Sequence, residues 1–149
     1  MMKLIHGFLA LLLFPLCALA GGQGQFVTRG DVIIHYAAVN TLEIPASTAR
    51  ALGVTRSGNR ALLVLNAQQS GDDGQTTPLP ATARGSVRNL LGQDKNPDFR
   101  PVEDQGVWYV LADFPISERE RIRFDLEVTP EGATSPIPLR FEQTFYRGR

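Results

Sequence analysis

The pentapeptide Asn89-Leu90-Leu91-Gly92-Gln93 holds the polar residues of this chain that are best placed to bind another molecule. Two amide side chains flank a glycine and two leucines, and surface loops often carry binding residues. Asn89, Gly92 and Gln93 are therefore candidate binding residues. The structural interpretation is the commoner one for such residues, and we favour it: Asn89 hydrogen-bonds the backbone across a turn, and Gly92 supplies a positive φ angle.

His35 is the second candidate, because it lies in an otherwise apolar segment with period-two alternation. If Ile34 and Tyr36 are on the core side of a strand, His35 faces outward, where an imidazole can act as a general base. The sequence offers no evident nucleophile or orienting carboxylate for it. A structural or simply exposed histidine is therefore the simpler interpretation.

Tyr146 is the third candidate, as a surface anchor near the C-terminus. In the alternating segment that contains it, Phe141 and Phe145 share the face expected to enter the core. Tyr146 shares the opposite face with Arg140 and Glu142. Its ring is therefore predicted to lie at the surface.

Carboxylates offer a different chemistry, because two acidic groups beside a cleft suffice in principle for glycoside cleavage. The candidates for such a site are Asp94, Asp98, Glu103 and Asp113. The loop at Asp72-Asp73-Gly74 lacks the ligand spacing of an EF-hand and is expected to be solvated. The charged run 118–123 is likewise expected to solvate a strand face. We assign no catalytic residue and no metal site.

Composition excludes several classes of protein. Without residues 1–20 the chain has 14 basic and 15 acidic side chains, a balance that disfavours a nucleic-acid partner or a polybasic membrane-surface protein. Cys17 is the only cysteine, so a chain without that segment has no disulfide and no thiolate metal site. The motifs of serine hydrolases, nucleotide-binding loops and zinc proteases are absent. We expect no cofactor.

Residues 1–20 have the pattern of a secretory signal peptide. Lys3 precedes a long apolar run, and Ala18 and Ala20 are the small residues that a signal peptidase recognises. The run is too short for a stable membrane span of about 20 residues. We therefore expect cleavage after Ala20, no transmembrane anchor, and a single exported domain over 21–149.

Period-two alternation predicts short strands through most of that domain. Strands are expected at 31–39, 61–67, within 79–90, and at 99–102, 107–114, 121–128 and 139–146. The run 107–114 is apolar on both faces, so it is expected to be a central strand that is covered on both sides.

One helix of about two turns is expected over Ile44 to Leu52, with Pro45 in its first turn and Gly53 as C-cap. Ala46, Ala49 and Leu52 share one face of it. Together the elements predict an all-β fold, an immunoglobulin-like antiparallel β-sandwich of about seven strands with one short helix.

The last two predicted strands specify their own register. Placing Leu126 opposite Leu139 brings apolar residues together on one face, and it brings opposite charges together on the other. Slipping the strands by two residues sets like charges opposite each other, which is unfavourable. The remaining pairs of this register are Phe124–Phe141, Val128–Ile137, Asp125–Arg140 and Arg123–Glu142.

Several strings give the chain a family resemblance. They are Val39-Asn40-Thr41-Leu42, Ile44-Pro45, Leu52-Gly53-Val54, Asn59-Arg60-Ala61-Leu62, Gly85, Asn89-Leu90-Leu91-Gly92-Gln93, Phe99-Arg100, Trp108-Tyr109 and the ending 141–146. The chain resembles the small exported bacterial proteins grouped as domain of unknown function 4426 (DUF4426). The resemblance implies a periplasmic β-sandwich of a Gram-negative bacterium, and it brings no catalytic residue or ligand with it.

Export, a small β domain and the lack of a catalytic constellation predict a periplasmic, non-enzymatic interaction protein. Its partner is another protein or an envelope component, and strand addition at an exposed sheet edge is one mode of binding. The alternatives are a small-ligand or metal-ion carrier, a hydrolase built on the carboxylates above, and a folding factor for a neighbouring exported protein.

Overall fold

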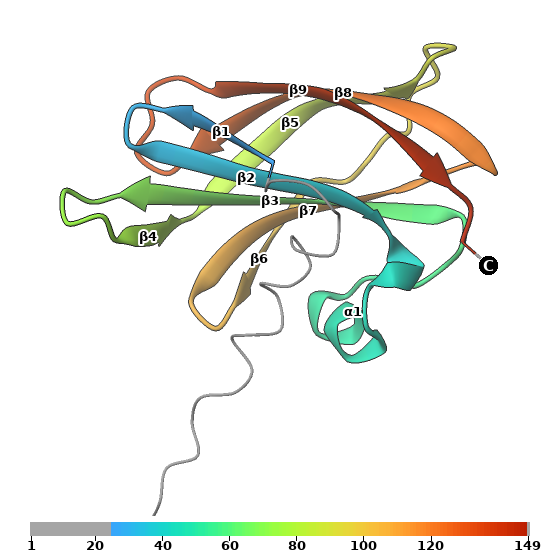
Figure 1. The fold of residues 1–149 in the computed structure, drawn as a ribbon, viewed down its shortest axis with the longest axis horizontal. Coiled ribbons are helices and arrows are strands. Elements are labelled where there is room, and N and C mark those ends of the chain that lie inside the picture. Colours follow the sequence, from blue (N-terminus) through green and yellow to red (C-terminus); the bar gives the residue numbers. More distant parts are fainter. Residues whose placement is uncertain (1–24, 149) are drawn as a thin grey trace, which may run out of the picture.

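Two antiparallel β-sheets and one short helix make up residues 25–148, the part of the chain that this computed structural model describes (Figure 1). The strands are β1 (Phe26–Arg29), β2 (Val32–Asn40), β3 (Arg60–Ser70), β4 (Thr76–Leu79), β5 (Ala81–Asn89), β6 (Arg100–Asp104), β7 (Val107–Pro115), β8 (Arg119–Pro130) and β9 (Ile137–Tyr146). The helix is α1 (Ala46–Leu52), and a 3₁₀ turn at Thr41–Glu43 precedes it.

The strand order agrees with the predicted sandwich. The first sheet has the order β1-β2-β3-β7-β6, with β4 paired to the end of β3, and the second sheet has the order β5-β8-β9. Without β1 and β4, these orders correspond to the ABED and CFG sheets of a constant-type immunoglobulin domain. The all-β sandwich is confirmed, and the strand order is compatible with an immunoglobulin-like architecture.

Two of the nine strands in residues 25–148 were not predicted. β1 and β4 have only four residues each, which is too short for a clear alternation. β4 also contains Pro78, which lacks the N–H that a strand interior uses. Both strands lie at the margin of the first sheet, where pairing on one side only is tolerated.

The predicted register of β8 and β9 is confirmed. Leu126 lies opposite Leu139, and the Asp125 and Arg140 side chains on the outer face are joined at 2.9 Å. The other predicted pairs, Phe124–Phe141, Val128–Ile137 and Arg123–Glu142, are also present. A slip by one residue would turn the whole apolar row to solvent, and a slip by two would lose the charge pairs of the outer face, so the two patterns together fix the pairing.

The main core lies between the sheets and centres on Phe124 of β8, which is fully buried. Its ring stacks on that of Phe141 with centroids 4.2 Å apart, and it meets the edge of Phe114 at 5.7 Å. Large aromatic rings that pack in these geometries contribute more than their buried area alone. β7 is covered on both faces, as predicted, because Phe114 enters this core and Leu111 faces the other way.

A second, smaller core covers one end of the outer face of the first sheet. Ala49 and Leu52 of α1 pack there against Leu62 and Leu111 (Figure 1). The helix begins at Ala46, two residues later than predicted, and ends at Leu52; the next residue, Gly53, has a φ of 66°, which is left-handed as the C-cap prediction requires. Ala46 is exposed in the first turn, although the sequence placed it on one face with Ala49 and Leu52.

Side chains tie the two sheets together at one edge. The Gln143 Nε2 atom on β9 donates a hydrogen bond to the Ala38 carbonyl on β2 at 2.7 Å. The buried Asn40 amide donates to the carbonyls of Gly58 at 3.1 Å and Tyr146 at 3.3 Å. The C-terminal strand is therefore held against the start of the helical segment.

The predicted signal peptide, residues 1–20, lies outside the described residues. Across 25–148, no helix has the length and hydropathy that crossing a membrane would require.

Candidate functional site

The side chain of Asn89 organises the turn after β5. Its Oδ1 atom accepts hydrogen bonds from the backbone N–H groups of Leu91 at 3.1 Å and Gln93 at 3.0 Å, and its Nδ2 atom donates to Gln93 Oε1 at 2.7 Å. Gly92 has a φ of 78° and donates its N–H to the Asn89 carbonyl at 3.0 Å. These contacts are the ones that the structural interpretation of this pentapeptide predicts. A binding role for Asn89, Gly92 and Gln93 stays a prediction.

Glu120 joins this turn to the start of β8. Its Oε1 atom accepts from Asn89 Nδ2 at 2.9 Å and pairs with Lys95 Nζ at 2.7 Å, while Oε2 accepts from the Ser117 N–H at 3.0 Å. The Lys95 and Glu120 side chains are only 12% and 10% exposed. Breaking such a pair leaves a desolvated charge behind, which is costly.

The environment of Glu120 sets its charge state. Burial raises the pKa of the carboxyl, but the hydrogen bonds from Lys95, Asn89 and the Ser117 N–H, with the charge of Lys95, outweigh it. The pKa of Glu120 therefore lies below its ordinary value, and the carboxylate stays ionised at neutral pH.

The anchored turn presents two leucines to solvent. Leu90 is 61% exposed and Leu91 is 84% exposed, while the turn that carries them is closed by the contacts of Asn89. Figure 1 shows this loop, between β5 and β6, projecting from the corner of the second sheet on the side away from α1. Single exposed apolar residues are ordinary, but two adjacent ones on a fixed turn form a contact surface.

Basic residues and Tyr146 lie at the same end of the second sheet as this turn. On the outer face of the second sheet, Arg119 is opposite Tyr146, which is 61% exposed as predicted. Arg121 and Arg123 each pair with the single carboxylate of Glu142 at 2.8 Å. The hydrogen bond from Arg123 and the charges of both arginines lower the pKa of Glu142.

His35 lies on the outer face of the first sheet, away from that corner. Its ring is half-buried beside Phe26, with centroids 6.0 Å apart, and burial lowers the pKa of the imidazole. Ile34 enters the core on the opposite side of the strand, as predicted. Within residues 25–148 no side chain hydrogen-bonds the imidazole, and its ring contact is with Phe26.

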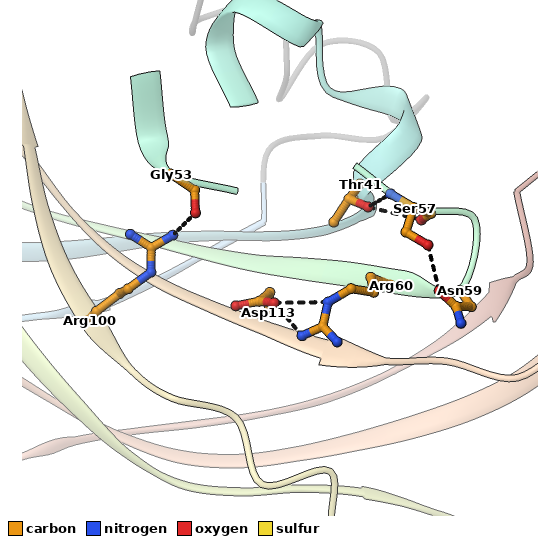
Figure 2. A network of polar contacts seen from close by, with 7 residues as sticks. All are labelled: Thr41, Gly53, Ser57, Asn59, Arg60, Arg100 and Asp113. Carbon is orange, nitrogen blue, oxygen red and sulfur yellow. Dashed lines mark hydrogen bonds and ion pairs between the residues drawn. The ribbon is translucent and has the colours of Figure 1, made fainter. Parts of the chain in front are cut away.

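The four candidate carboxylates do not converge on a cavity in the described part of the chain. Asp113 receives a hydrogen bond from Arg60 Nε at 3.0 Å, next to Arg100, which donates to the Gly53 carbonyl at the end of α1 (Figure 2). Asp94 pairs with Arg88 at 3.3 Å. Asp98 and Glu103 are exposed.

Two hollows of the described part of the chain are lined by other side chains. One is a thin apolar gap between the sheets beside Trp108 and Val128. The other is an open hollow of about 430 Å³, lined by Glu118, Arg119, Arg147 and Gly148. Within residues 25–148 no cluster of three His, Cys, Asp or Glu side chains has the geometry to hold a metal ion.

Sequence reasoning missed Glu120 and Lys95. The run 118–123 was expected to be solvated, and its arginines are, but Glu120 falls on the inward row of β8 beside Ile122. The alternation of this strand could have signalled an inward carboxylate. Its partners Asn89 and Lys95 are distant in the sequence, so their contact could not be read from local spacing.

The fold and this site define the class of the protein: a small β-sandwich with a rigid, apolar turn at one corner. The sequence pattern of the family described as "Domain of unknown function (DUF4426)" matches residues 26–148, and the chain belongs to that family. A comparison with curated proteins gives no match.

Solved structures agree with this assignment. The chain is similar to a DUF4426 family protein from Pseudomonas aeruginosa PAO1, with 28% identity and a TM-score of 0.72 over 85% of this chain and 97% of that one. It is also similar in fold to FetP of uropathogenic E. coli strain F11, with 10% identity and a TM-score of 0.54 over 85% and 95% of the two chains. A copper-bound FetP variant gives 11% identity and a TM-score of 0.55, over 85% and 92%.

Proposed function

We propose that the protein is a non-enzymatic interaction module of the periplasm, which contacts another protein or an envelope component through the turn 89–95. The observation that carries this proposal is the combination of exposure and rigidity at Leu90 and Leu91. When the backbone of exposed leucines is already fixed, binding has to order only their side chains, so more of their burial energy remains for binding.

The periplasmic location is supported by the pattern of residues 1–20 and by the likeness in fold to FetP, which was expressed recombinantly in the periplasm. We expect the form that accumulates after expression from Met1 to begin at Gly21. N-terminal sequencing and cell fractionation test this directly. A cytoplasmic form that retains Met1 would refute the export step.

The hydrolase alternative gains no support from the positions of its carboxylates, because Asp113 and Asp94 are held by arginines. The copper-bound FetP variant supports an ion-carrying alternative at the level of the fold only. The exposed turn, in contrast, is a specific feature of this chain's own described surface. It favours the interaction module over both alternatives.

Photo-crosslinking from the turn tests the proposal. A photoreactive amino acid replaces Leu91 in the full chain, and a matched variant carries it at Ala51, which is exposed on α1. We expect a specific, saturable crosslink in cells from position 91 and none above background from position 51. Equal crosslinking from both positions, or none from either, would refute the turn as the contact site.

A further inference from the structure

Two guanidinium groups without an ion-pair partner lie where β8 begins and β9 ends, at the same end of the second sheet as the exposed turn. Arg119 and Arg147 have no carboxylate within ion-pair distance among residues 25–148, and both line the open hollow of about 430 Å³. Glu118 is the one acidic residue that lines it in the described part of the chain. The hollow therefore carries an excess positive charge and suits an anionic group such as a phosphate.

The outer face of β8 continues this basic character. Arg121 and Arg123 share one carboxylate, Glu142, so their positive charge is only half compensated. The carboxylates of this strand's outer row, Asp125 and Glu127, lie toward its other end and are paired with Arg140 and Arg84. Charge is thus segregated along the strand, and its basic end is the one next to the turn.

Apolar and amphipathic side chains flank the basic end on both sides. Leu90 and Leu91 follow β5, whose Asn89 is opposite Ile122 of β8. Tyr146 ends β9, opposite Arg119. The leucines lie on a turn that projects from the sheet, and neither of them lines the two hollows described above (Figure 1). A convex apolar tip beside basic residues and a tyrosine ring fits a deformable interface better than a shaped pocket.

We propose that this corner docks on a bilayer surface that contains anionic phospholipid: Leu90 and Leu91 enter the acyl boundary, Tyr146 lies at headgroup level, and Arg119 and Arg147 bind lipid phosphates. The inference rests on the proposed function and names the envelope component. The net charge near zero does not argue against docking on an anionic bilayer, because it is a sum over the whole surface, whereas the basic residues gather at one place on it. Tyrosine and arginine are the side chains that interfacial sites favour.

Vesicle binding tests the inference. The chain is expressed from Met1, the form that accumulates is purified, and its co-sedimentation is measured with phosphatidylcholine vesicles with and without phosphatidylglycerol. We expect binding to the anionic vesicles that weakens as salt is added. Replacing Leu90→Ser and Leu91→Ser together should weaken it about tenfold or more. Replacing Arg119→Gln should weaken it about fivefold.

Matched variants separate a local effect from a general one. Phe26→Ser removes a similarly exposed apolar ring from β1, and Arg50→Gln removes an exposed charge from α1. Both should bind the anionic vesicles as the unaltered protein does. Thermal unfolding of every variant verifies that the fold is retained.

The outcomes are distinct. Loss of binding in the Leu90/Leu91 variant with retention in Phe26→Ser supports the inference. Equal binding to both vesicle types, or equal loss in the Phe26 variant, overturns it. If the unaltered protein binds no vesicles, the bilayer is excluded as its partner. A crosslink from position 91 to one protein would then leave the proposed function standing, with a protein partner.

Discussion

Replacing Asn89 with alanine tests the central structural claim, that one side chain fixes the exposed turn. The Asn89 amide makes four hydrogen bonds: two from the backbone N–H groups of Leu91 and Gln93, one to the Gln93 side chain and one to Glu120. Alanine removes all four. The Glu120 carboxylate keeps Lys95 and the Ser117 N–H as its partners.

The expected cost follows from these bonds. A hydrogen bond contributes about 0.5–1.5 kcal/mol net, and the low end applies here because water reaches the turn and replaces lost partners. Four bonds at the low end give a loss of about 2 kcal/mol in the free energy of unfolding. For a domain of this size, that loss lowers Tm by about 8 °C.

Asn89→Asp separates the roles of the two amide atoms. The substituted side chain keeps the acceptor for the two backbone N–H groups but brings a second carboxylate to within hydrogen-bond distance of Glu120 Oε1. We expect the variant to be no more stable than Asn89→Ala at neutral pH. The repulsion raises the pKa of the introduced carboxyl in the folded state, so the deficit should shrink as pH falls and that group is protonated.

Urea unfolding followed by tryptophan fluorescence measures both effects, because Trp108 is the only tryptophan and lies on β7 in the sandwich. Unfolding free energies are compared at neutral and acidic pH for the unaltered protein and the two variants. Ser47→Ala, at an exposed position of α1, is a matched control that should change stability little. A cost below about 0.5 kcal/mol for Asn89→Ala, or a pH-independent deficit for the aspartate variant, would contradict the reasoning.

Three further predictions concern residues that fix the frame of the site. The pKa of Glu120 is lower in the folded state than its ordinary value of 4.5, so the ionised carboxylate stabilises the fold above pH 4.5. This stabilisation is lost as pH falls through the folded-state pKa. Glu120→Gln should therefore flatten the acid dependence of the unfolding free energy, measured in urea. Gly85→Ala drives a Cβ into the Asp125 carbonyl at a φ of 140°, so we expect a loss of about 3 kcal/mol or more, and a change below about 1 kcal/mol would contradict the geometry. Asn40→Ala removes a buried donor to the Tyr146 and Gly58 carbonyls and should cost about 2–3 kcal/mol, measured in the same way; an unchanged midpoint would show that the C-terminal strand is held by other contacts.

The fold was largely predictable because its information is local and repetitive. In β8 every second residue from Ile122 to Val128 is apolar, and Phe124, Leu126 and Val128 each have an apolar partner on β9, so strand, face and register followed from the apolar and charged patterns. The short strands β1 and β4 were not predicted, because four residues are too few to show a clear alternation of apolar and polar side chains. Helix α1 was located by Pro45 and Gly53, which act on their own backbone.

The candidate site was predictable only in part. Asn89 and Gly92 indicate a turn, because the hydrogen bond that Asn89 accepts from Gln93 and the positive φ angle of Gly92 both lie within the five residues 89–93. Glu120 and Lys95 hold this turn to the sandwich. Glu120 is far from the turn in the sequence, and it lies in a run of charged residues that has nothing unusual in its composition. The alternation of β8 could have indicated that Glu120 turns inward, but it does not indicate which residues Glu120 contacts there.

The class of fold, the pairing of the last two strands and the family could be read from the amino-acid sequence, because hydrophobic periodicity and turn residues act over a few positions. Which charged residues gather together depends instead on how the strands pair in three dimensions. The region with Leu90, Leu91, Tyr146 and Arg119 is built from the ends of three strands, and sheet pairing brings those ends to one end of the second sheet. Composition averages over the surface, whereas recognition depends on how that surface is arranged.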